Sequence, residues 1–236
     1  MNQTKKAEGD VPISVYLCRH GETEYNALGI FQGQGVDLPL NAKGKEQARE
    51  LANLFGTLPV MEMGFSSPLQ RARETADIVL GGLHELRRFP LMVHPLLKEG
   101  SFGWAEGRKK DEVKAQIPDV YAAWREHHNF DARLPGGESQ GEIAARGMHF
   151  LDHVVELCHR GEIIAPLPER RIAVFSHASF LRCMLNKMGV ALDEIPNARP
   201  LKITYRKETG WCYDGLVVGG QASSTKEFVC TSQKVR

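Results

Sequence analysis

The sequence predicts an α/β fold, a three-layer α/β/α sandwich around a mostly parallel sheet. Short apolar runs bounded by turn residues alternate with segments of helical periodicity, which is typical of strands joined by crossover helices. Such crossovers are right-handed and place helices on both faces of the sheet. The 236 residues suffice for a single domain with a complete hydrophobic core.

Five apolar runs are short enough to be buried strands. They are residues 13–18, 60–65, 91–93, 172–175 and 201–205. Residues 1–10 are polar, with no apolar stretch behind their lysines, and we expect a disordered tail that is neither a signal peptide nor a membrane anchor. Residues 11–236 are interpreted as one folded domain.

Two helices are predicted from their starting residues. Asn41 is expected to cap a helix in which apolar residues recur at i, i+3, i+4 and i+7, and Gly56 is expected to end it. Ser67-Pro68 predicts an N-cap followed by proline at the first helical position.

A longer helix is expected after Ser139, whose spacing to Glu142 fits a capping box. It should end near Gly161, since glycine commonly follows a helix. Residues 100–137 carry no strand signal, and we interpret them as a helical lid or insertion lying over the sheet edge.

The charge balance excludes two classes of partner. Lysine and arginine number 30 against 29 acidic residues, and the net charge of +1 provides no broad field for nucleic acid or an anionic membrane. Any anion recognition must therefore be local. The five cysteines are scattered without a Cys-x-x-Cys pair, which favours a reducing, cytoplasmic compartment. The sequence leaves a homodimer open.

Two histidines, His20 and His177, each directly follow a predicted strand. Ligands of open α/β sheets bind beyond the carboxyl ends of the strands, so we expect both imidazoles in one crevice. Arg71 lies in the first turn of a predicted helix, where a cation opposes the helix dipole, and such violations often mark function. Together with Arg19, these groups suit a phosphate dianion, and their charge should keep His20 neutral.

Several sequence blocks then occur in a fixed order. The first is Arg19-His20-Gly21-Glu22-Thr23, followed by Asn26, Gln32-Gly33 and Asp37-Leu38-Pro39-Leu40. The later ones are Ser66–Ala72 with Thr75-Ala76, Leu97–Gly100 with Phe102-Gly103 and Glu106-Gly107, Pro135–Ser139, and Ser176-His177. In this order, over about residues 13–205, they resemble the histidine phosphatase superfamily, which has the phosphoglycerate mutase-like fold.

The resemblance implies a phosphomonoesterase that acts through a phosphohistidine on His20, without a metal. The implied catalytic residues are His20, Glu99, His177, Arg19 and Arg71. The implied phosphate-binding residues are Thr23, Asn26, Gln32, Gly33 and Ala178. Glu99 would protonate the leaving oxygen and then activate water, while the arginines and His177 hold the phosphoryl oxygens.

Two positions depart from the family pattern. Ile30 stands where the family often has arginine, so one auxiliary anion contact is expected to be missing. Ala178 replaces the glycine that is common after the second histidine. Neither position belongs to the implied catalytic set.

The length of the lid separates two functions. Glu138 follows Glu99 by 138 − 99 = 39 positions, and the cofactor-dependent mutases of the family carry a much longer insertion there. A short lid admits water, which favours a phosphatase acting on a small phosphorylated metabolite with no cofactor. The alternative is a phosphoglycerate mutase that depends on 2,3-bisphosphoglycerate. A non-catalytic binding module is less compatible with the intact catalytic set.

Other polar residues are interpreted as ordinary surface. His149 and His153 have the i, i+4 spacing that can bind zinc, but neighbours such as Arg146 indicate a solvated helix face. Lys109-Lys110 could meet a second anionic group, yet short basic pairs are usually solvated. Trp124 is interpreted as a packing residue.

Overall fold

The computed structural model describes residues 11–126, 129–163, 169–218 and 221–223. The tail predicted for residues 1–10 lies outside these described residues. No helix in the described ranges is both long enough and apolar enough to cross a bilayer.

One sheet runs through the molecule, with strands in the order β3-β2-β4-β1-β5-β6-β7. Their bounds are β1 (Ile13–Arg19), β2 (Met63–Ser66), β3 (Leu91–Val93), β4 (Arg170–Ser176), β5 (Pro200–Arg206), β6 (Gly210–Val218) and β7 (Gln221–Ser223). The pairs β1–β4, β4–β2 and β2–β3 are parallel, whereas β5, β6 and β7 add successively in antiparallel pairs.

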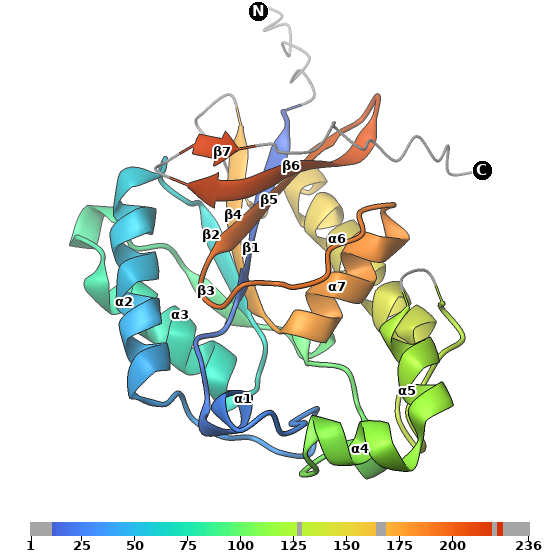
Figure 1. Cartoon of the computed structure of the whole chain (residues 1–236). Coiled ribbons are helices and arrows are strands. Elements are labelled where there is room, and N and C mark those ends of the chain that lie inside the picture. The colour runs from blue at the N-terminus through green and yellow to red at the C-terminus, as the bar shows by residue number, and fades with distance from the viewer. Residues whose placement is uncertain (1–10, 127–128, 164–168, 219–220, 224–236) are drawn as a thin grey trace, which may run out of the picture.

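Helices cover both faces of this sheet. The helices of the described residues are α1 (Glu24–Ala27), α2 (Ala42–Thr57), α3 (Gln70–Gly82), α4 (Lys110–Gln116), α5 (Pro118–Arg125), α6 (Gln140–His159) and α7 (Ala178–Lys187). Figure 1 shows α2 and α3 on one face and α6 and α7 on the other. The predicted three-layer α/β/α class is therefore confirmed.

The central strand β1 shows why most of its residues are apolar. Val15 and Leu17 pack in the core that contains residues of α6 and α7, while Tyr16 and Cys18 pack in the core that contains residues of α2 and α3. Successive side chains of a strand point to opposite faces, so a strand between two helical layers favours apolar residues on both of its faces.

The antiparallel end of the sheet was not predicted. Strand β6 follows β5 through a tight turn in which Gly210 has φ +71°, a conformation that favours glycine. Its sequence mixes Trp211 and Tyr213 with Asp214 and Gly215, so it lacks the unbroken apolar run that marked the other strands. The predominance of parallel strands therefore holds for β1 to β4 only.

Two predicted helix starts are confirmed. The Asn41 side chain accepts a hydrogen bond from Gly44 N, and Ser139 with Glu142 forms the complete capping box of α6. α6 ends at His159, and Gly161 follows with φ +73°, as expected.

Two other predictions of helix ends are wrong. α2 continues through Gly56 to Thr57 and stops before Pro59, because Gly56 keeps a helical conformation and proline disfavours helix in the residue before it. Ser67 does not cap α3, which begins at Gln70 after Leu69 without a side-chain cap. The Ser67 hydroxyl instead lies 2.8 Å from His177 Nε2.

The 100–137 segment is helical, as predicted, but it does not lie over a sheet edge. The edge strands are β3 and β7, whereas Lys110, Tyr121 and Trp124 of this segment line the same cavity as His20. α4 and α5 thus lie beyond the carboxyl ends of the parallel strands (Figure 1). They pack around a small separate core of Phe31, Phe102, Ala105, Val113, Trp124 and Leu134.

Candidate active site

His20 lies immediately after β1 and is only 3% exposed. Its Nδ1 lies 2.7 Å from the Gly21 carbonyl oxygen, which can only accept, so Nδ1 carries the proton. The backbone around it is also held, since His20 N donates to Ser176 O and Asn197 Nδ2 donates to His20 O. Nε2 is therefore left with a free lone pair in a fixed position.

The surroundings of His20 oppose its protonation. Burial lowers its pKa well below the ordinary value of 6.5, and the positive charges of Arg71 and Arg19 lower it further. A charged imidazolium would lose its hydration and face two guanidiniums. Near neutral pH the ring is consequently uncharged.

Arg71 and Arg19 are held by backbone carbonyl groups. Arg71 is 1% exposed and donates through Nη2 to Gly33 O at 2.8 Å and through Nη1 to Val36 O at 3.1 Å. Arg19 donates through Nη1 to Ile195 O at 2.9 Å. Burial lowers the pKa of both guanidiniums, which remain positively charged, since arginine stays protonated in proteins. These hydrogen bonds to carbonyl groups orient the two guanidinium groups and leave other N–H donors available for an anion.

His177 lies beside His20, and the two ring centroids are 5.1 Å apart. It is fully buried, its Nε2 pairs with Ser67 Oγ, and its Nδ1 has no partner among the described residues. Burial lowers the pKa of His177 well below its ordinary value, and Arg71 lowers it further. The structure thus brings both predicted histidines together, although His177 does not line the open cavity.

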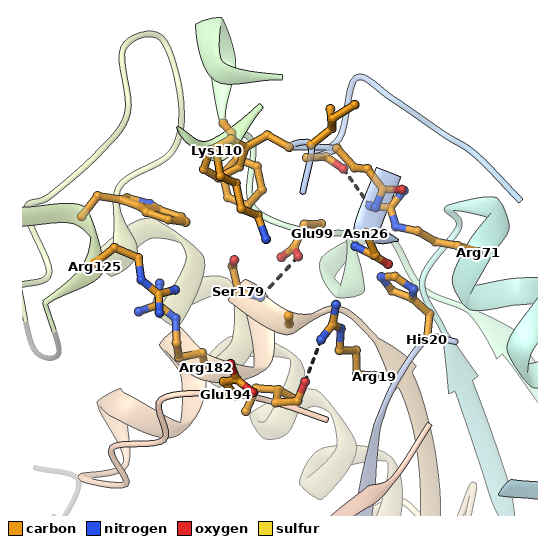
Figure 2. Close-up of a pocket in the computed structure, with 18 of the residues that line it drawn as sticks. Arg19, His20, Asn26, Arg71, Glu99, Lys110, Arg125, Ser179, Arg182 and Glu194 are labelled. Atoms are coloured by element: carbon orange, nitrogen blue, oxygen red, sulfur yellow. Dashed lines mark hydrogen bonds between the residues drawn. The ribbon is translucent and has the colours of Figure 1, made fainter. Parts of the chain in front are cut away.

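The Glu99 carboxylate is held at the start of α7. Oε1 accepts hydrogen bonds from Gly100 N and Phe180 N, both at 2.9 Å, and Oε2 accepts from Ser179 N at 3.3 Å (Figure 2). A helix N-terminus favours a carboxylate through its free N–H groups and its dipole. Glu99 and His20 line one cavity of about 370 Å³.

The predicted phosphate-binding residues divide into two groups. Asn26, Gln32, Gly33 and Ala178 line the cavity, and Gln32 Oε1 is a buried acceptor without a partner in the described part of the chain. Thr23 is not among the lining residues, because its hydroxyl caps α1 by accepting from Asn26 N. Ile30, where the family often has arginine, also lines the cavity and offers no charge there.

A second set of cations lines the other end of the cavity, and of these the sequence analysis considered only Lys110, which it interpreted as solvated. Figure 2 shows Arg125 and Arg182 on the side opposite His20 and Arg71, with Lys110 pointing between the two groups. Lys110 is thus not simply a solvated lysine, because its amino group faces the cavity. Although the residue as a whole is exposed, partial desolvation of its amino group in the cavity lowers the pKa of Lys110, and repulsion from Arg19 and Arg125 lowers it further.

Arg182 is the most unusual of these cations. It is 4% exposed, and neither Nη1 nor Nη2 has a hydrogen-bond partner among the described residues. Its guanidinium lies 5.4 Å from the centroid of the Trp124 ring, so Trp124 both packs the lid and lines the cavity. One signal was present in the sequence: Arg182 follows Ala178 by four positions and therefore shares its helix face.

The histidine pair considered for zinc, His149 and His153, lies on α6. No group of three His, Cys, Asp or Glu side chains in the described ranges lies close enough together to hold a metal ion.

Comparison with known proteins identifies the family. The family model "Histidine phosphatase superfamily (branch 1)" matches residues 15–210. The chain belongs to this superfamily. It is 36% identical over 139 residues to the zebrafish (Danio rerio) protein named fructose-2,6-bisphosphatase TIGAR B, and the match covers 59% of this chain and 52% of that protein. The chain therefore spans about half the length of that relative.

A second relative is matched over nearly its whole length. The probable phosphoglycerate mutase GpmB of Enterobacter sp. (strain 638) is 33% identical over 215 residues, which cover 87% of this chain and 91% of that protein. Among solved structures, mycobacterial glucosyl-3-phosphoglycerate phosphatase in complex with VO3 has a TM-score of 0.68 at 25% identity, covering 90% of this chain and all of that one. Phosphatases and mutase-like enzymes are thus both found among its relatives.

Proposed function

We propose that this chain is a metal-independent phosphomonoesterase that forms a phosphohistidine on His20. The observation that carries the proposal is a buried, neutral imidazole whose free Nε2 shares a cavity with Arg19, Arg71 and Glu99. A neutral nitrogen nucleophile, forked donors for phosphoryl oxygens and a carboxyl group are what phosphate ester cleavage requires.

In the first step, His20 Nε2 attacks phosphorus and the bond from phosphorus to the ester oxygen breaks. An alkoxide is a poor leaving group, so protonated Glu99 transfers its proton to that oxygen and the alcohol departs. Arg19 and Arg71 stabilise the charge on the phosphoryl oxygens. Each charge-assisted hydrogen bond is worth about 1.5–3 kcal/mol.

In the second step, the Glu99 carboxylate accepts a proton from water as that water attacks phosphorus. The bond between phosphorus and His20 Nε2 breaks, inorganic phosphate leaves, and the imidazole returns to its neutral form with Nδ1–H still bound to Gly21 O. Glu99 is protonated again and ready for the next ester. All protons and bonds are thereby accounted for without a cofactor.

The substrate proposed for this site is a small metabolite with a second anionic group. The cations Lys110, Arg125 and Arg182 at the far end of the cavity support this choice, because Arg182 is buried and its Nη1 and Nη2 have no hydrogen-bond partner in the part of the chain that the structure describes. Asp193 and Glu194 also line that end, and they disfavour a purely anionic molecule without hydroxyl groups. Two of the relatives act on such molecules by name, a bisphosphate and a phosphoglycerate derivative.

Trapping tests the proposed intermediate directly. A phosphorus-32 ester is mixed with the enzyme and quenched, and we expect protein-bound label that is labile in acid and stable in base. The label should disappear in His20→Ala and persist in His159→Ala, which removes an exposed histidine outside the cavity. Label retained by His20→Ala would refute the proposed nucleophile.

The nearly full-length similarity to a probable phosphoglycerate mutase makes mutase activity the second candidate. Both reactions share the phosphohistidine, and they differ in whether water or a second substrate receives the phosphoryl group. Conversion of 3- to 2-phosphoglycerate is measured with and without 2,3-bisphosphoglycerate. Turnover that the bisphosphate stimulates, and that exceeds phosphate release, would assign the chain as a mutase.

A further inference from the structure

The sequence predicted that Arg146 of α6 lies on a solvated helix face, but the structure shows that it does not. Its side chain is 15% exposed, and its guanidinium contacts the backbone that carries Glu99. Nη1 donates to Leu96 O and to Lys98 O, both at 2.7 Å, and Nη2 donates to Glu99 O at 3.2 Å. One side chain thus binds three carbonyl groups of a single short segment.

Glu138 completes this arrangement from the opposite side. It accepts from Arg146 Nε at 3.2 Å and from Arg146 Nη2 at 3.0 Å, and it also accepts from Ser101 N at 2.8 Å. Gln34 Nε2 donates both to Glu138 and to Glu99 O. The segment from residue 96 to residue 101 is therefore held by one partly buried ion pair and by Gln34.

Side-chain hydrogen bonds are required to hold this segment in place, because it is not part of a strand or an α-helix. It consists of the end of a 3-10 turn (Pro95–Leu97) and a loop, so its carbonyl groups have no ladder of backbone partners. Its packing against α6 is also close, since a Cβ atom at Gly100 would lie 2.5 Å from Ile143 Cδ1. Removing Arg146 would leave Leu96 O and Lys98 O without this donor, and Glu99 O would keep only its bond from Gln34.

The same guanidinium is linked to the other end of Glu99. It lies 5.1 Å from the centroid of the Phe180 ring, and Phe180 N donates to Glu99 Oε1. The backbone of Glu99 is thus held by α6 while its carboxylate is held by α7. Neither Arg146 nor Glu138 lines the cavity, so neither can touch a substrate there.

We propose that Arg146, together with Glu138, is a positioning residue that sets the distance and direction of the Glu99 carboxyl group relative to the leaving oxygen. The inference rests on the proposed phosphatase function, in which Glu99 is the general acid. A shift of about 1 Å in a catalytic group can lower the rate about 100-fold, so loss of the Arg146 hydrogen bonds should have a measurable effect on the rate.

A purely structural role gives a different result from a positioning role. Loss of folded protein lowers activity on every substrate by the same factor. Loss of general acid placement instead slows esters whose alkoxide needs a proton, and it spares esters whose leaving group departs unaided. The ratio of the two activities therefore separates the roles, and it does not depend on the amount of folded enzyme.

The experiment measures kcat/KM for an alkyl phosphate and for 2,4-dinitrophenyl phosphate in the full chain. The variants are Arg146→Gln, Arg146→Lys and Glu138→Gln, with Glu99→Gln as the reference for a missing acid. The matched control is Arg133→Gln, which breaks an exposed arginine–glutamate pair with Glu142 near the start of the same helix. Thermal melting of each variant records its stability.

We expect Arg146→Gln to lower kcat/KM about 10- to 100-fold on the alkyl ester and no more than a few-fold on the dinitrophenyl ester. Arg146→Lys should lie between wild type and Arg146→Gln, and Arg133→Gln should match wild type. In the Glu99→Gln background, Arg146→Gln should add almost no further loss, because coupled residues are not additive. Equal losses on both esters, or full additivity with Glu99→Gln, would overturn the proposal.

Failure of the proposed function looks different from failure of this inference. If Glu99→Gln itself affects both esters equally, Glu99 is not the general acid and the proposed mechanism falls. If Glu99→Gln is selective for the alkyl ester and Arg146→Gln is not, the mechanism stands and only the positioning role is refuted. If Arg146→Gln does not fold, Arg146→Lys and Glu138→Gln decide between the two roles.

Discussion

The two ends of the cavity are built in different ways. One end, called the phosphate end, contains His20 and Arg71. His20 follows strand β1 and Arg71 lies in the first turn of α3, and both are almost fully buried with hydrogen-bonded side chains. At the lid end, Lys110 and Arg125 come from two short helices with a core of their own, and both are exposed. Only Arg182, from α7, is buried there.

This difference indicates a division of labour. Groups that must meet phosphorus within a fraction of an ångström belong on the rigid sheet, because small displacements cost large factors in rate. Groups that choose among esters can belong to a separately packed lid. We therefore expect changes at the phosphate end to affect every substrate, and changes at the lid end to affect only esters with a second anionic group.

The largest effect is expected at the nucleophile. His20→Ala should lower hydrolysis of p-nitrophenyl phosphate, measured with a chelator present, by about 10⁴-fold or more, since removal of a nucleophile has effects of this order. His159→Ala is the control and should match wild type. A His20→Ala enzyme that retained a tenth of the activity would break the assignment of the phosphate end.

The pH dependence of stability is the next largest effect at this end. The pKa values of His20 and His177 lie well below 6.5 in the folded protein, so the unfolded chain binds more protons below about pH 6.5. Their contribution to stability is complete above that pH and declines as the pH falls. Each histidine contributes a slope of up to about 1.4 kcal/mol per pH unit.

Urea unfolding between pH 7.5 and pH 5.5 measures this slope. In His20→Gln or His177→Gln, the fall in the free energy of unfolding should become shallower by up to about 1.4 kcal/mol per pH unit for each histidine removed. A slope identical to that of wild type in both variants would contradict the buried, neutral state of these rings.

At the lid end, Arg182→Gln should lower kcat/KM for some substrates and not for others. It removes a buried cation worth about 1.5–3 kcal/mol to a bound anion, so kcat/KM for a bisphosphate or phospho-carboxylate substrate should fall about 10- to 100-fold. Hydrolysis of p-nitrophenyl phosphate should change little. Arg160→Gln, an exposed arginine at the end of α6, is the control. Equal losses on both substrates would remove the distinction between the two ends.

The smallest effect is expected for Arg125→Gln. This residue is exposed, and solvent screens its charge, so the contribution to binding should be at most about 1 kcal/mol, or about five-fold in kcat/KM. The loss should shrink further when salt is raised, because screening increases with ionic strength. A salt-independent loss as large as that for Arg182→Gln would show that the lid closes over Arg125.

Much of the phosphate end was predictable because local rules and motif order agree there. His20 and His177 follow strands, and Arg71 opens a helix against the local dipole preference, so each is visible in the chain itself. The capping box of Ser139 was equally predictable from the sequence. Arg146 was misread, because its acidic and basic sequence neighbours are exposed while its own side chain crosses to another segment.

By itself, the sequence determined the family and the three-layer class, and it named the residues proposed to bind phosphate, since these depend on periodicities and motifs written over short stretches. Only the tertiary structure decided that β5 to β7 run antiparallel to their neighbours, that Arg182 is buried beside Trp124 with no hydrogen-bond partner for Nη1 and Nη2 among the described residues, and that Arg146 binds the backbone of Glu99. The physical reason is shared by all three. Each depends on which distant backbone or ring a segment meets, and that contact leaves no local pattern in the chain.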